Sequence, residues 1–199
     1  MRVIRIFFSK TGEAAYISHL DLQRVMARAL RRSGIPVWYS QGFNPHIYMS
    51  FALPLPLMQE SMVEAMDCKT ESKLDDFSGF LPPLNEALPR GIEAYRIEEP
   101  VYQAADIGFA EYRINYAMER LRLRNALLAF NSMPEAMVVR KTKRSEKEMN
   151  LKELVPSLEV DAETASFAVR LPAGGEFNIN PELLTGFLQN EFDLPRAHI

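Results

Sequence analysis

The chain has 199 residues, of which 47% are hydrophobic and 25% charged, and its formal net charge is −3. This composition is typical of a globular protein of one or two domains and excludes long disorder. One cysteine and three histidines exclude an internal disulfide, the usual four-ligand zinc site and a cysteine-held iron–sulfur cluster, so we expect no metal and no cofactor. The N-terminus lacks a signal-peptide pattern, and no apolar run reaches the roughly 20 residues of a membrane helix. We therefore expect a cytoplasmic protein without membrane contact.

The first half of the chain predicts the element order β-α-β-β-α-β. A strand at 3–8 is followed by a helix that begins after Ser18 and stops at Gly34. We expect 62–68 to be a continuation or an edge strand, because Pro54 and Pro56 keep that segment out of a central sheet position. The other expected elements are strands at 37–39, 47–53 and 93–98 and a weak helix at 72–88.

The second half repeats this order after a linker at 100–108. The pattern predicts strands at 111–117, 136–143 and 166–171, helices at 118–130 and 181–190, and a charged turn that leads into 150–155. The last strand would begin near Ala197, where the chain stops. The fold class is therefore α+β: tandem ferredoxin-like (βαββαβ) units with antiparallel sheets and helices on one face. We expect domains at 1–103 and 104–199, the second truncated at its last strand.

Charge is distributed unevenly along the chain. Residues 1–46 hold seven Lys/Arg against two Asp/Glu, whereas residues 47–199 hold sixteen against twenty-four. A basic front end on a mildly acidic protein indicates an anionic partner. We name a further group of basic residues the second basic spot: Arg140, Lys141, Lys143, Arg144 and Lys147. Glu146 and Glu148 lie between or beside them, so we interpret this group as a solvated hairpin tip.

Four arginines lie on the expected helix after Ser18. At about 100° per residue, Arg24, Arg28 and Arg31 share one narrow sector, with Arg32 beside them. A solvated outer face would explain them, but only Asp21 lies close enough to offset their charge. Because the guanidinium fork fits phosphate oxygens and stacks on bases, we favour phosphate contact.

The loop at 39–46, YSQGFNPH, is the most specific local signal. Gly42 and Asn44-Pro45 fix the turn, while Tyr39 and Phe43 are either stacking surfaces for bases or part of a hairpin packed on the core. Trp38 and Cys68 are expected in the core. The residues predicted to bind nucleic acid are Lys10, Arg24, Arg28, Arg31, Arg32, Tyr39, Phe43, Asn44 and His46.

Two histidines, His19 and His46, are candidates for catalysis. If they converge, they can act as general acid and base, with Tyr16 assisting. With Asp21 they could instead hold a divalent metal, but the spacing is not diagnostic. For each histidine alone we favour a structural role, such as bonding a backbone carbonyl.

The segment KTGEAAYISHLDLQRVMARALRRSGIPVWYSQGFNPHIYMSFALPLPL resembles the radical-SAM-linked domain, a bacterial family of unknown function. Its members are small separate proteins or are fused behind radical S-adenosylmethionine proteins that carry a cobalamin-binding domain. In SMVEAMDC the acidic residues Glu64 and Asp67 are retained, and in RKTKRSEKEMNLKELV the family's Asp position is Asn150. The resemblance implies a radical SAM, cobalamin-binding partner but no reaction.

The arginine-rich helix followed by IPVWYSQGFNPH is also similar, more distantly, to the first domain of CRISPR repeat-processing endoribonucleases. Those are tandem ferredoxin-like proteins that bind RNA. We therefore expect an RNA-binding or substrate-presenting accessory to a radical SAM enzyme, and more a binding protein than an enzyme. The alternatives are a metal-independent endoribonuclease that uses His19 and His46, and a protein-interaction module without nucleic-acid contact.

Overall fold

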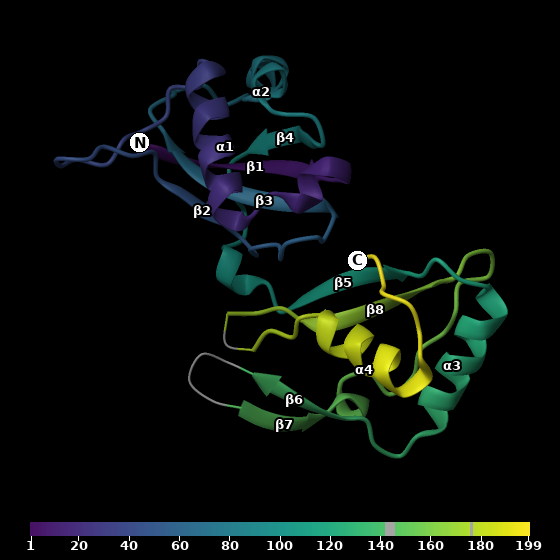
Figure 1. Cartoon of the computed structure of the whole chain (residues 1–199). Helices are drawn as coiled ribbons and strands as arrows, with labels where there is room; N and C mark the ends of the chain where they lie inside the picture. The colour runs from purple at the N-terminus through teal and green to yellow at the C-terminus, as the bar shows by residue number, and fades with distance from the viewer. Residues whose placement is uncertain (142–145, 176) are drawn as a thin grey trace. The chain divides into compact units, whose positions relative to one another are not determined.

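The computed structural model describes residues 1–141, 146–175 and 177–199. The chain divides into two compact units, Met1–Asp106 and Ile107–Ile199, each with its own hydrophobic core (Figure 1). Within the described part of the chain, no helix is long and apolar enough to cross a membrane.

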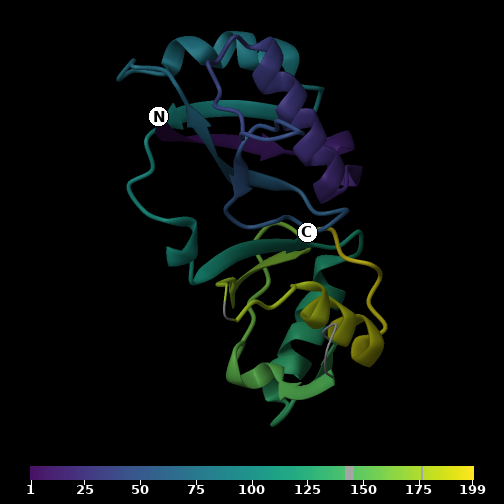
Figure 2. The same ribbon diagram turned by 90° about the vertical axis from the view of Figure 1, so that its left-hand side faces the viewer.

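The first unit is a complete ferredoxin-like fold, as predicted. Its four strands form one antiparallel sheet in the order β2-β3-β1-β4, which is the strand order of a βαββαβ unit. Figures 1 and 2 show both helices on the same face of this sheet. Its elements are β1 (Arg2–Lys10), α1 (His19–Arg32), β2 (Met49–Phe51), β3 (Ser61–Thr70), α2 (Leu81–Ala87) and β4 (Ile92–Glu98).

The core of this unit lies between the sheet and the two helices. Alternate residues of β1, Ile4, Ile6 and Phe8, are fully buried, because successive side chains of a strand point to opposite faces. Helix α1 buries Leu22, Met26, Ala29 and Leu30, the stripe that its sequence periodicity predicts. This packing directs the opposite side of α1 toward solvent.

Two predictions for this unit were wrong in detail. Strand β3 is central, between β2 and β1, and not an edge strand. Pro54 and Pro56 lie before its first residue, so they remove no hydrogen bond from the ladder. Residues 37–39 form no strand, since only single bridges join Val37 to Thr70 and Tyr39 to Ile47.

The second unit contains the same order with one rearrangement. Its elements are β5 (Phe109–Asn115), α3 (Arg120–Ser132), β6 (Met137–Lys141), β7 (Glu146–Asn150), β8 (Ser166–Pro172) and α4 (Glu182–Phe192). Strands β5 and β8 pair antiparallel, and His198 adds one bridge to Asn115 on β5. This arrangement matches the first, third and fourth strands of a βαββαβ unit.

The hairpin β6–β7 is the departure from that pattern. Strand β6 pairs with β7 and forms a separate two-stranded sheet. Residues 150–155 do not continue as a strand, because β7 ends at Asn150 and the 3₁₀ turn η4 (Leu151–Glu153) follows. The side chain of Asn150 causes this turn, since its Oδ1 accepts hydrogen bonds from the backbone N–H groups of Lys152 (3.1 Å) and Ala136 (2.9 Å).

Candidate nucleic-acid interface

The exposed side of α1 carries four arginines in a row. Ser18 caps the helix and its Oγ accepts the backbone N–H of Asp21 at 3.2 Å. Because the apolar stripe of α1 is buried, the opposite side of the helix faces solvent. We name these exposed residues the arginine row: Arg24, Arg28, Arg31 and Arg32.

Most of the charge in the arginine row is not neutralised. Asp21 pairs with Arg24 at 2.8 Å, and the pKa of Asp21 is lowered by its hydrogen bonds, first from Ser18 and then from Arg24. No acidic side chain among the described residues pairs with Arg28, Arg31 or Arg32. The last two lie in the final turn of α1, where positive charge also complements the helix dipole. Three guanidinium groups thus remain available to an anion.

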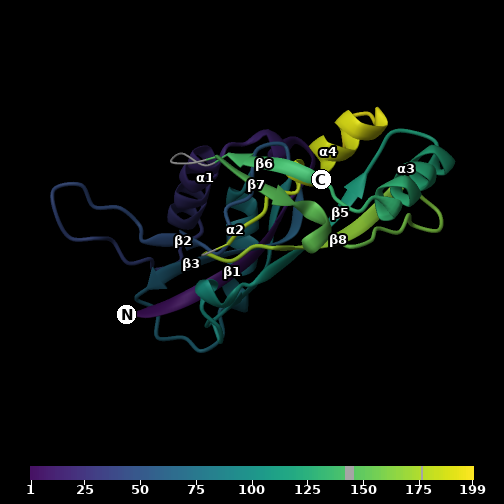
Figure 3. The same cartoon turned by 90° about the horizontal axis from the view of Figure 1, so that it is seen from below.

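A hairpin formed by residues 37–47 leaves the fold directly after α1. Figures 1 and 3 show this segment extending beyond the edge of the sheet. Its tip is closed by Ser40 and His46: the Ser40 N–H donates to the His46 carbonyl at 2.8 Å, and the His46 N–H donates to Ser40 Oγ at 3.1 Å. Nδ1 of His46 also lies 2.8 Å from Ser40 Oγ and 3.2 Å from the Asn44 carbonyl. His46 therefore holds the shape of the tip.

The tip of this hairpin presents an aromatic ring to solvent. Phe43 is fully exposed, and Tyr39 at the neck of the tip is 40% exposed. Gly42, which precedes Phe43, has φ +135, a backbone conformation that side chains rarely adopt. Phe43 is thus not packed on the core, which leaves both of its ring faces open to a stacking partner.

The base of the hairpin is fixed by a cation between two aromatic rings. Lys69 Nζ on β3 lies 4.3 Å from the ring centroid of Tyr48 and 5.1 Å from that of Trp38. The backbone N–H of Trp38 donates to the Lys69 carbonyl at 2.9 Å. Trp38 is half-buried at the hairpin base. It is not part of the core, so the prediction from the sequence that it lies there was wrong. No sequence motif indicated this role for Lys69.

The two candidate catalytic histidines have separate surroundings. Nε2 of His19 lies 2.9 Å from the amide nitrogen of Gln23, and the His19 ring packs edge-on against Phe51 at 5.0 Å. The hydrogen bonds of His46 lie within its own loop, and no hydrogen bond or ring contact joins the two histidines among the described residues. Tyr16 is 68% exposed. The described residues also contain no group of His, Cys, Asp or Glu that could hold a metal ion.

Lys10, which was also predicted to bind nucleic acid, does not lie on this surface. It is 1% exposed, and its Nζ donates to the Ala15 carbonyl at 3.2 Å. Burial lowers the pKa of Lys10, partly offset by the charges of Glu64 and Glu60. Burial likewise raises the pKa of Glu64. The side chains of Lys10 and Glu64 both lie in the interior, where β1 ends and β3 begins.

Cys68 and the second basic spot were also assigned from the sequence. Cys68 is buried, as predicted, and burial raises the pKa of its thiol to about 12, so it is not a reactive nucleophile. Of the second basic spot, Lys143 and Arg144 lie outside the described residues. Arg140 and Lys147 are described and occupy β6 and β7.

The fold and the exposed surface define a class: a two-unit, ferredoxin-like α+β protein with a basic helix and a projecting aromatic hairpin. The model of the family described as "uncharacterized protein conserved in bacteria (DUF2344)" matches residues 3–181. The chain therefore belongs to this bacterial family. No curated protein matches the chain.

Proposed function

We propose that this protein binds single-stranded RNA through the arginine row and the hairpin tip that carries Phe43. The observation that supports this most is the exposure of Arg28, Arg31 and Arg32 on α1 without an acidic partner among the described residues. A helix face that served only solubility would be expected to pair its charges at i,i+3 and i,i+4, as Asp21 and Arg24 do.

The spacing of the arginine row suits a phosphate backbone. Arg24 and Arg28 are four residues apart and Arg28 and Arg31 three, so neighbouring side chains start about 5–6 Å apart on one helix face. Each guanidinium group can donate two parallel hydrogen bonds to one phosphate. A row of three or four such groups would follow consecutive phosphates of a single strand.

The hairpin would supply the contact to bases. An aromatic ring that is fully exposed stacks on any base, and such stacking contributes about 1–3 kcal/mol per base. The bonds between Ser40 and His46 fix the tip before binding, so that less conformational entropy is lost when RNA binds. Because α1 leads directly into the hairpin, both groups can engage one RNA segment.

The resemblance to radical-SAM-linked proteins supports an accessory role. In this proposal a radical SAM, cobalamin-binding enzyme carries out the chemistry, and this chain holds the RNA substrate. The chain has a single cysteine, and it is buried. An iron–sulfur cluster needs several cysteine thiolates, so the cluster would be supplied by the partner.

Fluorescence anisotropy of a labelled single-stranded RNA tests the binding. With three to four phosphate contacts, the affinity should fall about 20- to 50-fold between 50 and 200 mM salt. Absence of binding at 50 mM salt would refute the proposal. If the chain then still co-purified with a radical SAM protein after nuclease treatment, protein docking alone would be the better account.

A further inference from the structure

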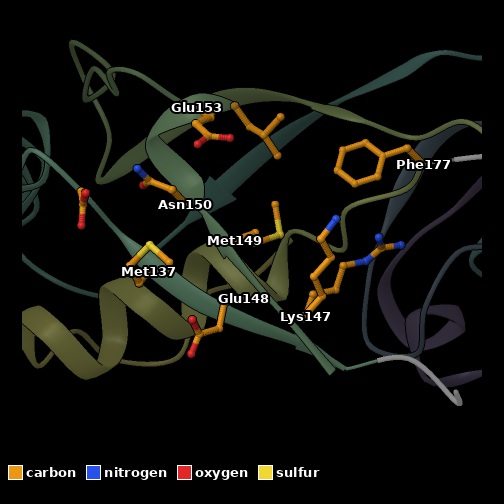
Figure 4. Close-up of a pocket in the computed structure, with 10 residues that line it drawn as sticks. Met137, Lys147, Glu148, Met149, Asn150, Glu153 and Phe177 are labelled. Atoms are coloured by element: carbon orange, nitrogen blue, oxygen red, sulfur yellow. The ribbon is translucent and has the colours of Figure 1, made fainter. Parts of the chain in front are cut away.

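A cavity of about 500 Å³ lies in the second unit, beside the β6–β7 hairpin (Figure 4). Its walls come from both strands of the hairpin, from η4 and from Phe177, which follows β8. Cavities of about 300–1,000 Å³ with a few converging polar groups are typical of small-molecule sites. The proposed RNA contact on α1 makes no use of this cavity.

One end of the cavity concentrates positive charge. Arg140 and Lys147 are direct partners in the register of β6 and β7. Like charges directly opposite each other destabilise a strand pair. No acidic side chain in the described part of the chain forms an ion pair with either residue. An anion bound between them would remove this repulsion.

An aromatic ring stands at the same end. The guanidinium carbon of Arg140 lies 5.2 Å from the ring centroid of Phe177, and Phe177 is 41% exposed. Figure 4 shows Phe177 and Lys147 at one end of the cavity. A flat ring system can stack on an aromatic ring or on the plane of a guanidinium group. The anion that fits this end is therefore one attached to a flat ring.

The other end offers polar groups of the opposite kind. Glu153 and Asn150 lie there, separated from Phe177 and Lys147 by Met149 (Figure 4). Asn150 Oδ1 accepts hydrogen bonds from two backbone N–H groups, and these bonds fix the orientation of the side-chain amide. Its Nδ2 has no acceptor within the described residues and remains free to donate. A carboxylate and an amide donor together suit the hydroxyl groups of a sugar.

The charge of the lining limits the charge of the ligand. Two cations, Arg140 and Lys147, can balance the charge of one phosphate group, whereas the three glutamates that also line the cavity would repel the additional phosphates of a di- or triphosphate. We propose that the cavity binds a single nucleotide that carries one phosphate, either a free nucleoside monophosphate or the phosphorylated end of an RNA. The phosphate lies between Arg140 and Lys147, the base lies at Phe177, and the sugar hydroxyls face Glu153 and Asn150.

Isothermal titration calorimetry of the full chain with each of the four nucleoside 5′-monophosphates tests this site. At least one should bind more tightly than its nucleoside, than inorganic phosphate and than its triphosphate. Arg140→Gln and Lys147→Gln should each weaken binding about tenfold or more, because each removes a charge-assisted hydrogen bond. Arg170→Gln is the matched control, since Arg170 lies over Phe109 at 4.5 Å in the same unit but does not line the cavity.

The variants also separate a ligand role from a structural one. Removing one of two like charges should leave the melting temperature unchanged or raise it, whereas a structural role for Arg140 would lower it in both Arg140→Gln and Arg140→Lys. RNA oligonucleotides with and without a 5′-phosphate identify the source: tighter binding of the phosphorylated RNA than of the monophosphate indicates an RNA end, and equal binding a free nucleotide. No binding of any monophosphate at millimolar concentration, or equal binding of monophosphate and triphosphate, would overturn the proposal.

Discussion

Nδ1 of His46 lies 2.8 Å from Oγ of Ser40, and the backbones of the same two residues exchange a further hydrogen bond at 2.8 Å. This pair closes the tip of the hairpin formed by residues 37–47. It gives His46 a structural use at a place where a histidine would otherwise suggest catalysis. It also explains how a short, fully exposed loop can present Phe43 in one defined position.

Ser40→Ala and His46→Ala should weaken RNA binding to a similar extent, by about 1 kcal/mol each, because both remove the same closing interaction. The double variant should then bind RNA with the same affinity as the single variant that binds RNA less tightly. Anisotropy titrations of all four proteins give this double-mutant cycle. Fully additive losses would show that the two residues act separately, and loss confined to His46→Ala would point to a chemical role for the ring.

Phe43→Ala should weaken binding of single-stranded RNA by about 1–3 kcal/mol and leave the free energy of unfolding unchanged. The ring is fully exposed, so its removal creates no cavity. Phe43→Trp retains a stacking surface and should retain affinity. If Phe43→Ala and the wild-type protein bind RNA equally, the hairpin tip is not part of the interface.

Glu64 should make the stability of the first unit depend on pH. Burial raises the pKa of Glu64 in the folded protein above its ordinary value of 4.5. The folded state therefore keeps this proton to higher pH than the unfolded state does. Its contribution to stability is fully present below pH 4.5 and is lost as the pH rises through the folded pKa.

Glu64→Gln removes this titration and serves as the comparison. Urea unfolding of both proteins at several pH values, followed by fluorescence of Trp38, the one tryptophan of the chain, reports on the first unit. As the pH falls from 7 toward 4.5, the wild-type protein should gain stability relative to Glu64→Gln. A difference between the two proteins that stays constant with pH would contradict the assignment.

Gly91→Ala should destabilise the first unit far more than Gly34→Ala. Both glycines have positive φ, +86 and +74. A Cβ on Gly91 would lie 2.5 Å from the carbonyl oxygen of Thr11, whereas a Cβ on Gly34 would meet nothing within 4 Å. We expect a loss of about 1–2 kcal/mol at Gly34 from backbone strain alone, and about 2–5 kcal/mol at Gly91. Equal losses in urea unfolding would show that the contact at Thr11 relaxes at little cost.

Local patterns of the sequence were sufficient for most of the fold. The apolar stripe and Ser18 cap define α1, and the alternation of Ile4, Ile6 and Phe8 defines β1. The errors occurred where pairing depends on distant residues. The central position of β3 follows from its ladder with β1. In a βαββαβ unit the second strand pairs with the third, but here β6 pairs with β7 and not with β8. No local pattern encodes such choices.

The candidate site was predictable only in part. Periodicity places the arginine row on the outer face of α1, and the YSQGFNPH motif marks the hairpin. The burial of Lys10 depends on the residues packed around the end of β1, and the position of Lys69 between Tyr48 and Trp38 depends on strand pairing. The role of Asn150 was also not predictable from the sequence. Its Oδ1 accepts hydrogen bonds from two backbone N–H groups, a role that an aspartate carboxylate can also fill.

The salt dependence of RNA binding in Arg28→Gln/Arg31→Gln tests the central claim most directly. Both side chains are exposed, so the fold should be retained. If each arginine contacts one phosphate, the slope of log affinity against log salt should become shallower by about 1.4, roughly 0.7 for each contact. Arg124→Gln, an exposed helix arginine of the second unit, should leave the slope unchanged. An unchanged slope and affinity in the double variant would show that RNA does not bind at the arginine row.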